Sequence, residues 1–213
     1  MIITALKQKG NNVIIYFDEG ESISLDYRTI ADSGLRKNDS IDETAKSKLI
    51  SDSNFHKAKD SAFRILSGRQ HSVYEIRTKL FQKKIDKETI DRVIEQLLAG
   101  RFLNDEKFAH AYTEERSGKK VGVNKIKAEL HKKGISREII KSTLEGLNSE
   151  AGFEQAQELA KRKLESLKRK ETDKRKIKSK LFSFLISRGY ESDIIMKIVN
   201  ELNFYDEQED GTE

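Results

Sequence analysis

The feature that most constrains this chain of 213 residues is a pair of short amphipathic helices joined by a tight turn. The clearest copy spans residues 123–147. Gly134 ends its first helix, because glycine adopts the left-handed conformation of a helix C-cap without steric cost. Ser136 is placed to cap the second helix. Two such short helices cannot bury their apolar faces alone, so the pattern predicts further copies or partner helices.

The same apolar spacing occurs 50 residues earlier and 55 residues later, and it keeps the same step across the turn. In the middle copy the positions are Ile126, Leu130, Ile135, Ile140, Leu144 and Leu147. The earlier copy has Ile76, Leu80, Ile85, Ile90, Ile94 and Leu97, and the later one has Leu181, Leu185, Tyr190, Ile195, Val199 and Leu202. A period near fifty residues is typical of stacked helical units. The first helix of each unit does not align without gaps.

The composition favours small helical units over one large globule. Hydrophobic and charged residues each make up 36% of the chain, which indicates a thin core under a charged surface. Proline is absent, as expected for a chain that is mostly helix. We therefore predict a mainly α fold of three tandem three-helix repeats.

The first 27 residues follow a different period. Apolar residues at Ile3, 13–17, Ile23 and Leu25 are separated by turn sequences around Gly10 and Gly20, which predicts a three-stranded β-meander. An isolated sheet of this size is only marginally stable. We expect it to pack on a helix, either residues 27–33 or the segment after Ser40.

Local signals set the expected boundaries along the rest of the chain. Separate helices are predicted at 42–50 and 55–66, and Ser72 with Glu75 forms a capping box for the next helix. Asp86 is a cap for a helix to about residue 99, and Ser192 is a candidate cap for the last. The predicted divisions are an N-terminal extension at 1–52, repeats at 53–101, 102–148 and 149–205, and a disordered acidic tail at 206–213.

Several classes of chemistry lack their sequence signals. There is no cysteine, which excludes disulfides and thiolate chemistry and fits a reducing cytoplasm. No signal peptide is evident, and the longest apolar run, residues 13–17, is too short to span a membrane. Phosphate-binding glycine loops and nucleophile motifs are missing, and His56, His71, His110 and His131 lack metal-ligand spacing. We expect a cytoplasmic protein that is not an enzyme and uses no cofactor or metal.

Positive charge on helices is the remaining signal. The net charge is +5, and eleven basic residues gather between Lys161 and Lys180. Cations at helix C-termini and solvated helix faces explain part of this pattern, since the helix dipole favours each such cation by about 0.3–1 kcal/mol. The dense cluster instead favours an anionic partner, either nucleic acid or an acidic protein surface. Few aromatic residues interrupt the basic runs, which argues against a stacking platform for single strands.

Three segments resemble signatures of the RecX family of bacterial regulatory proteins. Residues 62–80, AFRILSGRQHSVYEIRTKL, resemble an alanine-bearing helix followed by L-S-x-R-x-x-S and x-x-E-[IL]-x-x-K-L. Residues 103–109 resemble L-[DN]-D-x-x-[FY]-A, and residues 122–135 resemble G-x-x-x-I-x-x-E-L-x-x-K-G-I. The likeness is strong over 58–147 and follows the repeat pattern over 150–203. Residues 1–57 resemble the extension of longer members.

Two departures from the family pattern stand out. Lys84 occupies a position where the family often has glycine, which predicts a looser C-cap in the first unit. The long basic helix that opens the third unit has no family signature, so the resemblance assigns no role to its charges.

The resemblance implies an elongated, curved array of three-helix repeats that binds the RecA recombinase filament. It also implies inhibition of the ATPase, strand-exchange and co-protease activities of RecA, by a protein acting as a monomer. A basic surface could meet acidic RecA residues or filament DNA. The candidate partner-binding residues are Lys119, Lys120, Lys125, Lys132, Lys133, Lys174, Arg175 and Lys176.

Two alternatives remain open. The first is a helical nucleic-acid-binding module that acts without RecA, with the third helix of each unit in a groove. Those helices, at 87–97, 137–147 and 191–202, carry at least as many acidic as basic residues, which argues against it. The second is a structural scaffold with no RecA role, against which the family signature argues.

Overall fold

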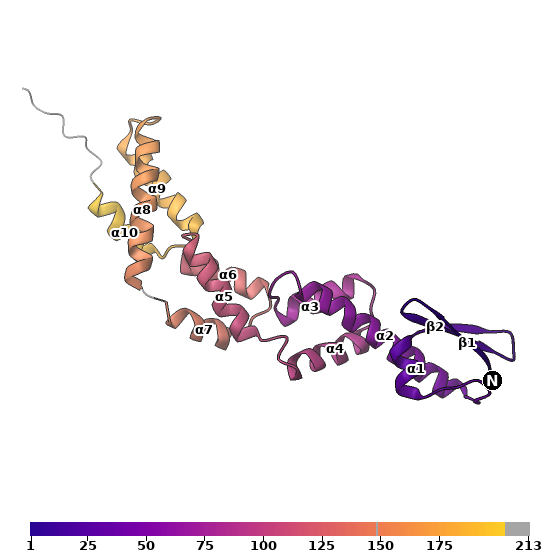
Figure 1. The fold of residues 1–213 in the computed structure, drawn as a ribbon. Helices are drawn as coiled ribbons and strands as arrows, with labels where there is room; N and C mark the ends of the chain where they lie inside the picture. The colour runs from indigo at the N-terminus through magenta and orange to yellow at the C-terminus, as the bar shows by residue number, and fades with distance from the viewer. Residues whose placement is uncertain (148, 203–213) are drawn as a thin grey trace, which may run out of the picture. The chain divides into compact units, whose positions relative to one another are not determined.

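The computed structural model describes residues 1–147 and 149–202, and its contacts divide the chain into unit 1, residues 1–104, and unit 2, which begins at Asp105. The described residues form three strands and ten helices (Figure 1), which confirms the prediction of a mainly α fold with a small N-terminal sheet. The predicted acidic tail at 206–213 lies outside the described residues. No described helix is both long enough and apolar enough to cross a membrane.

The N-terminal sheet is the predicted meander. Strands β1 (Ile3–Lys9), β2 (Asn12–Phe17) and β3 (Ser22–Asp26) pair antiparallel in the order β1-β2-β3. Its buried face carries Ile3, Ile15, Phe17 and Leu25, which pack with Ile41 and Leu49. Helices α1 (Tyr27–Ser33) and α2 (Glu43–Leu66) both contact the sheet, so the two expected helical supports are both used.

The prediction of separate helices at 42–50 and 55–66 is wrong, because α2 is one continuous helix of 24 residues. Residues 51–54, Ser-Asp-Ser-Asn, favour turns by local side-chain bonding. Tertiary contacts override that preference. Ser53 is buried and its hydroxyl accepts a 2.8 Å hydrogen bond from the Asp26 amide, while Asp52 pairs with Arg92 at 2.9 Å. The expected boundary at 52/53 therefore falls inside a helix.

A buried carboxylate fastens the sheet to α2. Asp26 is only 2% exposed, and it caps α1 by accepting a 3.0 Å bond from the Arg28 amide. The Arg28 guanidinium bridges Asp26, at 2.8 Å, and Asp60 on α2, at 2.6 Å. The hydrogen bond from the Arg28 side chain lowers the pKa of Asp26, against the opposing effect of burial.

The first repeat consists of α2, α3 (Val73–Gln82) and α4 (Lys87–Ala99). The predicted caps are confirmed: the Ser72 hydroxyl accepts from the Glu75 amide at 3.1 Å, and Asp86 accepts from the Thr89 amide at 2.8 Å. The core contains Ile76, Leu80, Ile90, Ile94 and Leu97, which the repeat spacing predicts, together with Ala58, Ala62, Val93 and Leu103.

Unit 2 holds the second and third repeats. Its helices are α5 (Asp105–Gly118), α6 (Val123–Lys132), α7 (Arg137–Glu145), α8 (Ser149–Lys168), α9 (Lys174–Arg188) and α10 (Ser192–Glu201). Ser136 caps α7 as predicted, at 3.3 Å from the Ile139 amide. Ser192 does not cap α10. It is the first residue of that helix, and the N-cap is Glu191, which makes no side-chain capping bond.

The turn between the second and third helices has the same conformation in all three repeats. The amide after the left-handed residue bonds a carbonyl five residues earlier: Ile85 to Leu80 at 3.4 Å, Ile135 to Leu130 at 3.2 Å, and Tyr190 to Leu185 at 3.2 Å. The left-handed residue is Lys84, Gly134 or Gly189, with φ of 61°, 75° and 90°. Lys84 thus keeps the same turn as the two glycines, with the longest of the three closing bonds, and the looser C-cap expected there stays a prediction.

Replacing Lys84 by glycine should stabilise unit 1 by about 1 kcal/mol, because glycine reaches a positive φ without the contact between Cβ and the backbone. Urea unfolding of the full chain, followed by circular dichroism, measures the change. Lys79→Gly is the control. Lys79 lies inside α3, so the same substitution should there cost about 1 kcal/mol. Destabilisation by both substitutions would contradict the strain at Lys84.

Candidate partner-binding surface

The second and third repeats meet backbone to backbone within unit 2. The Gly122 amide donates to the Arg188 carbonyl at 2.9 Å, and the Asn124 amide donates to the Gly189 carbonyl at 3.0 Å. A Cβ atom on Gly122 would lie 2.3 Å from the carbonyl carbon and oxygen of Gly189. This junction therefore requires glycine on both sides, and Gly122 replaces the serine cap that Ser72 provides in the first repeat.

Two of the predicted partner-binding lysines belong to this junction. Lys120 adopts a left-handed conformation with φ of 56°. Its ammonium forms an ion pair with Glu158 of α8, and its backbone carbonyl accepts a 3.1 Å hydrogen bond from the Tyr190 hydroxyl. The Lys125 ammonium donates to the Ser187 carbonyl at 3.2 Å. Both side chains therefore hold the two repeats together, whatever else they contact.

The other second-repeat lysines lie elsewhere on the unit. Lys119, at the end of α5, pairs with Glu115 at 2.5 Å. The Lys133 ammonium stacks over Phe108 and Tyr112, 5.7 Å and 4.9 Å from the ring centroids. Lys132 is exposed at the end of α6. Of these three, Lys132 is the one whose ammonium has no hydrogen bond or ion pair among the described residues.

A charged network joins α5 to α6 beneath Lys133. Glu129 accepts from the Tyr112 hydroxyl at 3.0 Å and from Arg116 at 2.7 Å. Burial, reinforced by the bond to Glu129, raises the pKa of Tyr112 to about 12. Burial acts to raise the pKa of Glu129 as well, but the bonds from Arg116 and Tyr112 lower it overall. Because the charges of Arg116 and Glu129 pair with each other, we assign this network to the stability of the second repeat.

The third-repeat residues Lys174, Arg175 and Lys176 form the first turn of α9 and are exposed. They belong to a larger group at the turn between α8 and α9 (Figure 1), here called the basic tip. Its members are Lys168, Arg169, Lys170, Lys174, Arg175, Lys176, Lys178 and Lys180. The acids there are Glu171, which pairs with Lys180 at 2.9 Å, and Asp173, which caps α9.

Helix stability explains only part of the basic tip. Lys168 to Lys170 lie at the C-terminal end of α8, where the dipole favours cations. Lys174 to Lys176 lie at the N-terminal end of α9, where the dipole disfavours them. The explanation by C-terminal cations thus fails for Lys174, Arg175 and Lys176.

The eight predicted residues do not form one surface. Lys125 contacts the C-terminal end of α9, while Lys174 to Lys176 lie at its N-terminal end. The 15 residues of α9 separate these ends by about 22 Å. The basic tip and the junction are therefore separate features of unit 2.

Sequence reasoning missed several exposed apolar groups and cavities. Tyr74 and Phe81 are 52% and 68% exposed on α3, and Phe102 is 59% exposed after α4. Tyr74 and Phe81 are seven residues apart and lie off the helix face that carries Ile76 and Leu80, so their spacing could have revealed them.

A cavity of about 440 Å³ lies between the second and third repeats, lined by Val121, Ile126, Leu144, Ala151, Tyr190 and Ile194. No sequence signal predicts it, because its walls are far apart in the chain.

The histidines join no metal-binding group in the described part of the chain. His71 is buried, and its Nδ1 lies 3.0 Å from a Glu75 carboxylate oxygen. Burial and the nearby Arg69 charge lower the pKa of His71. No group of three metal-binding side chains occurs among residues 1–147 and 149–202.

Family models match all three repeats. They are described as the first, second and third three-helix domains of RecX, and they match residues 58–97, 104–144 and 150–199. The regulatory protein RecX of Clostridium perfringens strain 13 is 37% identical over 200 residues, 94% of each chain. The regulatory protein RecX of Clostridioides difficile strain 630 is 32% identical over 210 residues, 97% of this chain and 98% of that one.

Solved structures have the same fold. A crystal structure of regulatory protein RecX superposes with a TM-score of 0.76 at 20% identity, covering 94% of this chain and 99% of that chain. The RecX structure from Lactobacillus salivarius gives a TM-score of 0.62 at 25% identity, covering 70% and 96%. With three consecutive domains matched and relatives above 30% identity along nearly its whole length, this chain belongs to the RecX family of regulatory proteins.

Proposed function

We propose that this protein is a non-enzymatic, monomeric regulator that binds the RecA recombinase filament in the cytoplasm. In this proposal it inhibits the ATPase, strand-exchange and co-protease activities of RecA. Membership of a family of regulatory proteins supports the general role. The single structural observation that supports the contact is the basic tip, whose exposed cations lie partly against a helix dipole.

We assign the first contact with the partner to Lys174, Arg175 and Lys176. These three residues are exposed in the first turn of α9, where the helix dipole disfavours cations. Exposed charges of this kind chiefly accelerate and orient association, and apolar anchors supply most of the affinity. Acidic RecA side chains and filament DNA both suit the tip electrostatically.

Single-stranded-DNA-dependent ATP hydrolysis by the cognate RecA tests this function, with the protein titrated below one molecule per RecA. The wild-type protein should reduce hydrolysis well below that ratio. The triple variant Lys174→Gln, Arg175→Gln, Lys176→Gln should need about tenfold more protein for half-inhibition, because it loses three steering charges.

The control variant makes the same change in charge at dispersed positions: Lys127→Gln, Arg137→Gln and Lys197→Gln. These residues are exposed on α6, α7 and α10. Their substitution should shift half-inhibition less than twofold. Equal shifts in the two triple variants would mean that net charge, and not the basic tip, governs the effect.

The second candidate function is nucleic-acid binding without RecA, and the basic tip is again the observation that favours it. It predicts tight DNA binding whose affinity falls steeply with salt concentration. No inhibition of RecA at excess protein, together with such DNA binding in the same buffer, would overturn the RecA proposal.

A further inference from the structure

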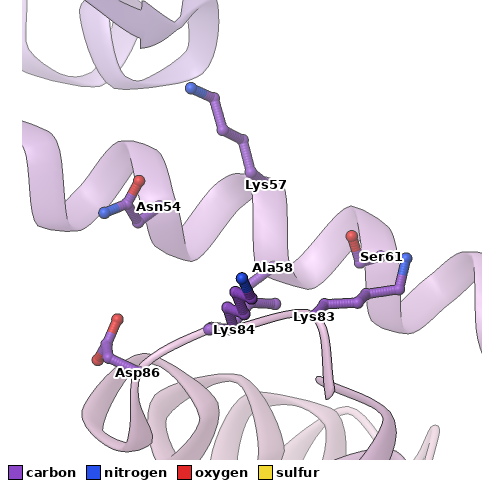
Figure 2. Close-up of a pocket in the computed structure, with 8 residues that line it drawn as sticks. Asn54, Lys57, Ala58, Ser61, Lys83, Lys84 and Asp86 are labelled. Carbon is purple, nitrogen blue, oxygen red and sulfur yellow. The ribbon is translucent and has the colours of Figure 1, made fainter. Parts of the chain in front are cut away.

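The first repeat contains an open polar pocket of about 410 Å³, here called the repeat-1 pocket. One wall is a single stripe of α2 that includes Asn54, Ala58 and Ser61, and the other is the turn between α3 and α4 at residues 83–86. Figure 2 shows Lys83 extending along α2 toward Ser61, Lys84 beside Ala58, and Asp86 at the Asn54 end of the pocket. Lys57 also lines it, with its ammonium directed away from the turn.

Comparison with the second repeat explains why this space is open. Lys133 stands at the position of Lys83, fifty residues later, after the same helix and in the same type of turn. There the rings of Phe108 and Tyr112 on α5 lie beneath the ammonium. In the first repeat the helix facing the turn presents the methyl group of Ala58 instead. The same turn therefore covers packed rings in one repeat and a pocket in the other.

The two cations of the turn gain from the dipole of α3, whose C-cap is Lys83, but they have no specific intramolecular partner among the described residues. Within the described residues, the ammonium groups of Lys83 and Lys84 form no hydrogen bond or ion pair. Lys84 also occupies a left-handed position that the other two repeats give to glycine. A lysine held in an unfavourable conformation, with its charge toward a pocket, favours a role in binding an anion.

The rest of the lining indicates which anion fits. Asp86 lies at one end, where its carboxylate accepts a 2.8 Å hydrogen bond from the Thr89 amide, and this bond lowers the pKa of a carboxyl that is already ionised at neutral pH. A nucleic-acid backbone carries a charge on every residue and would bring a neighbouring phosphate toward this carboxylate. A peptide can place one carboxylate at the lysines and an amide near Asp86. Asn54 and Ser61 can also bond peptide groups.

We propose that the repeat-1 pocket binds an acidic side chain of a protein partner. A glutamate or aspartate carboxylate lies between the ammonium groups of Lys83 and Lys84. Ala58 and Ile85 contact the methylenes of that side chain, and the peptide backbone beside it extends toward Asn54 and Asp86. The residues of this site belong to unit 1 and those of the basic tip to unit 2, and the inference does not depend on RecA being the partner.

The test titrates the full chain with a blocked ten-residue peptide that carries a single glutamate among glycine and serine residues. Lysine side-chain ammonium signals in nitrogen-15 NMR spectra report the contact directly. Signals of Lys83 and Lys84 should shift with the glutamate peptide and stay in place with a matched peptide that has glutamine instead. Equal shifts with both peptides, or no shift at millimolar concentration, would overturn the proposal.

Two variants that match in charge and backbone conformation separate the pocket from general electrostatics. Lys84→Gly and Arg101→Gly each remove one exposed cation from a left-handed residue, with φ of 61° and 58°, and Arg101 lies outside the pocket. Both variants should fold at least as stably as the wild type, because each relieves the same strain. The dissociation constant for the glutamate peptide should rise about fivefold in Lys84→Gly, because losing one ionic contact reduces the binding free energy by about 1 kcal/mol. It should remain unchanged in Arg101→Gly.

A thymidine ten-mer is the competing probe. If the ten-mer binds more tightly than the peptide and loses affinity selectively in Lys84→Gly, the pocket is a phosphodiester site and the peptide proposal is wrong. Since no RecA is present in these titrations, a negative result removes this site without affecting the outcome of the ATPase test.

Discussion

Replacing Gly189 by alanine is expected to destabilise unit 2 by about 3 kcal/mol or more, since the substitution combines backbone strain with overlap. Gly189 has φ of 90°, and its Cβ would lie 2.3 Å from the Lys125 Cβ and 2.5 Å from the Lys125 amide nitrogen. The backbones of α6 and α9 would have to separate, breaking the bonds that Gly122 and Asn124 make. Urea unfolding followed by the NMR signals of α6 and α9 measures the loss.

Two further glycine substitutions separate the causes. Gly34 has φ of 67° but open space where a Cβ would stand, so Gly34→Ala should cost only about 1 kcal/mol, from backbone strain alone. Gly122 has φ of −73°, so Gly122→Ala adds overlap with Gly189 and no strain. A cost for Gly189→Ala no larger than for Gly34→Ala would mean that the two repeats are not held in contact.

Replacing Asp26 by alanine should destabilise unit 1 by about 3 kcal/mol, the range for breaking a buried, hydrogen-bonded ion pair. The variant loses the cap of α1 and the partner of Arg28 together. Thermal and urea unfolding of the wild type and the variant give the difference. Asp60→Ala is the control, because Asp60 is 36% exposed and Arg28 would keep its bonds to Asp26. That substitution should cost less than about 1 kcal/mol.

The effect of Asp26 should depend on pH with a defined sign. Its pKa is lowered in the folded protein, so the unfolded state binds a proton more readily. The stabilisation is complete above the ordinary carboxyl pKa near 3.9 and is lost as the pH falls through the lower folded pKa. The difference between wild type and Asp26→Ala should therefore stay constant above about pH 5 and shrink below about pH 4. A difference independent of pH would contradict the role of the Arg28 bond.

The elements that the sequence predicts well are those fixed by neighbouring residues. Ser72, Asp86 and Ser136 each cap a helix through an amide three residues away, so the signal and the bond lie within one short segment. The division of α2 was predicted wrongly because its polar middle is stabilised from outside. Asp26 and Arg92, which hold residues 52 and 53, are 27 and 40 positions away.

The features of the candidate surface also differ in whether neighbouring or distant residues determine them. The basic tip could be predicted as a cluster because its members surround one turn. The roles of Lys120 and Lys125 could not be, since their partners Glu158 and Ser187 are 38 and 62 residues distant. The repeat-1 pocket depends on a small residue, Ala58, that in the sequence reads only as part of an apolar stripe.

The continuity of α2 has a consequence for how the N-terminal extension can be dissected. A truncation at residue 53 would remove the Asp42 cap and the first ten residues of a helix whose remaining part belongs to the core of the first repeat. It would also deprive Arg92 of Asp52. The sheet and the first repeat therefore cannot be separated by truncation. A shortened protein would lose the N-terminal extension and would also have a destabilised first repeat, so the two effects could not be distinguished. Substitutions on exposed positions of the strands, which leave the helix whole, are the cleaner genetic route to the role of the extension.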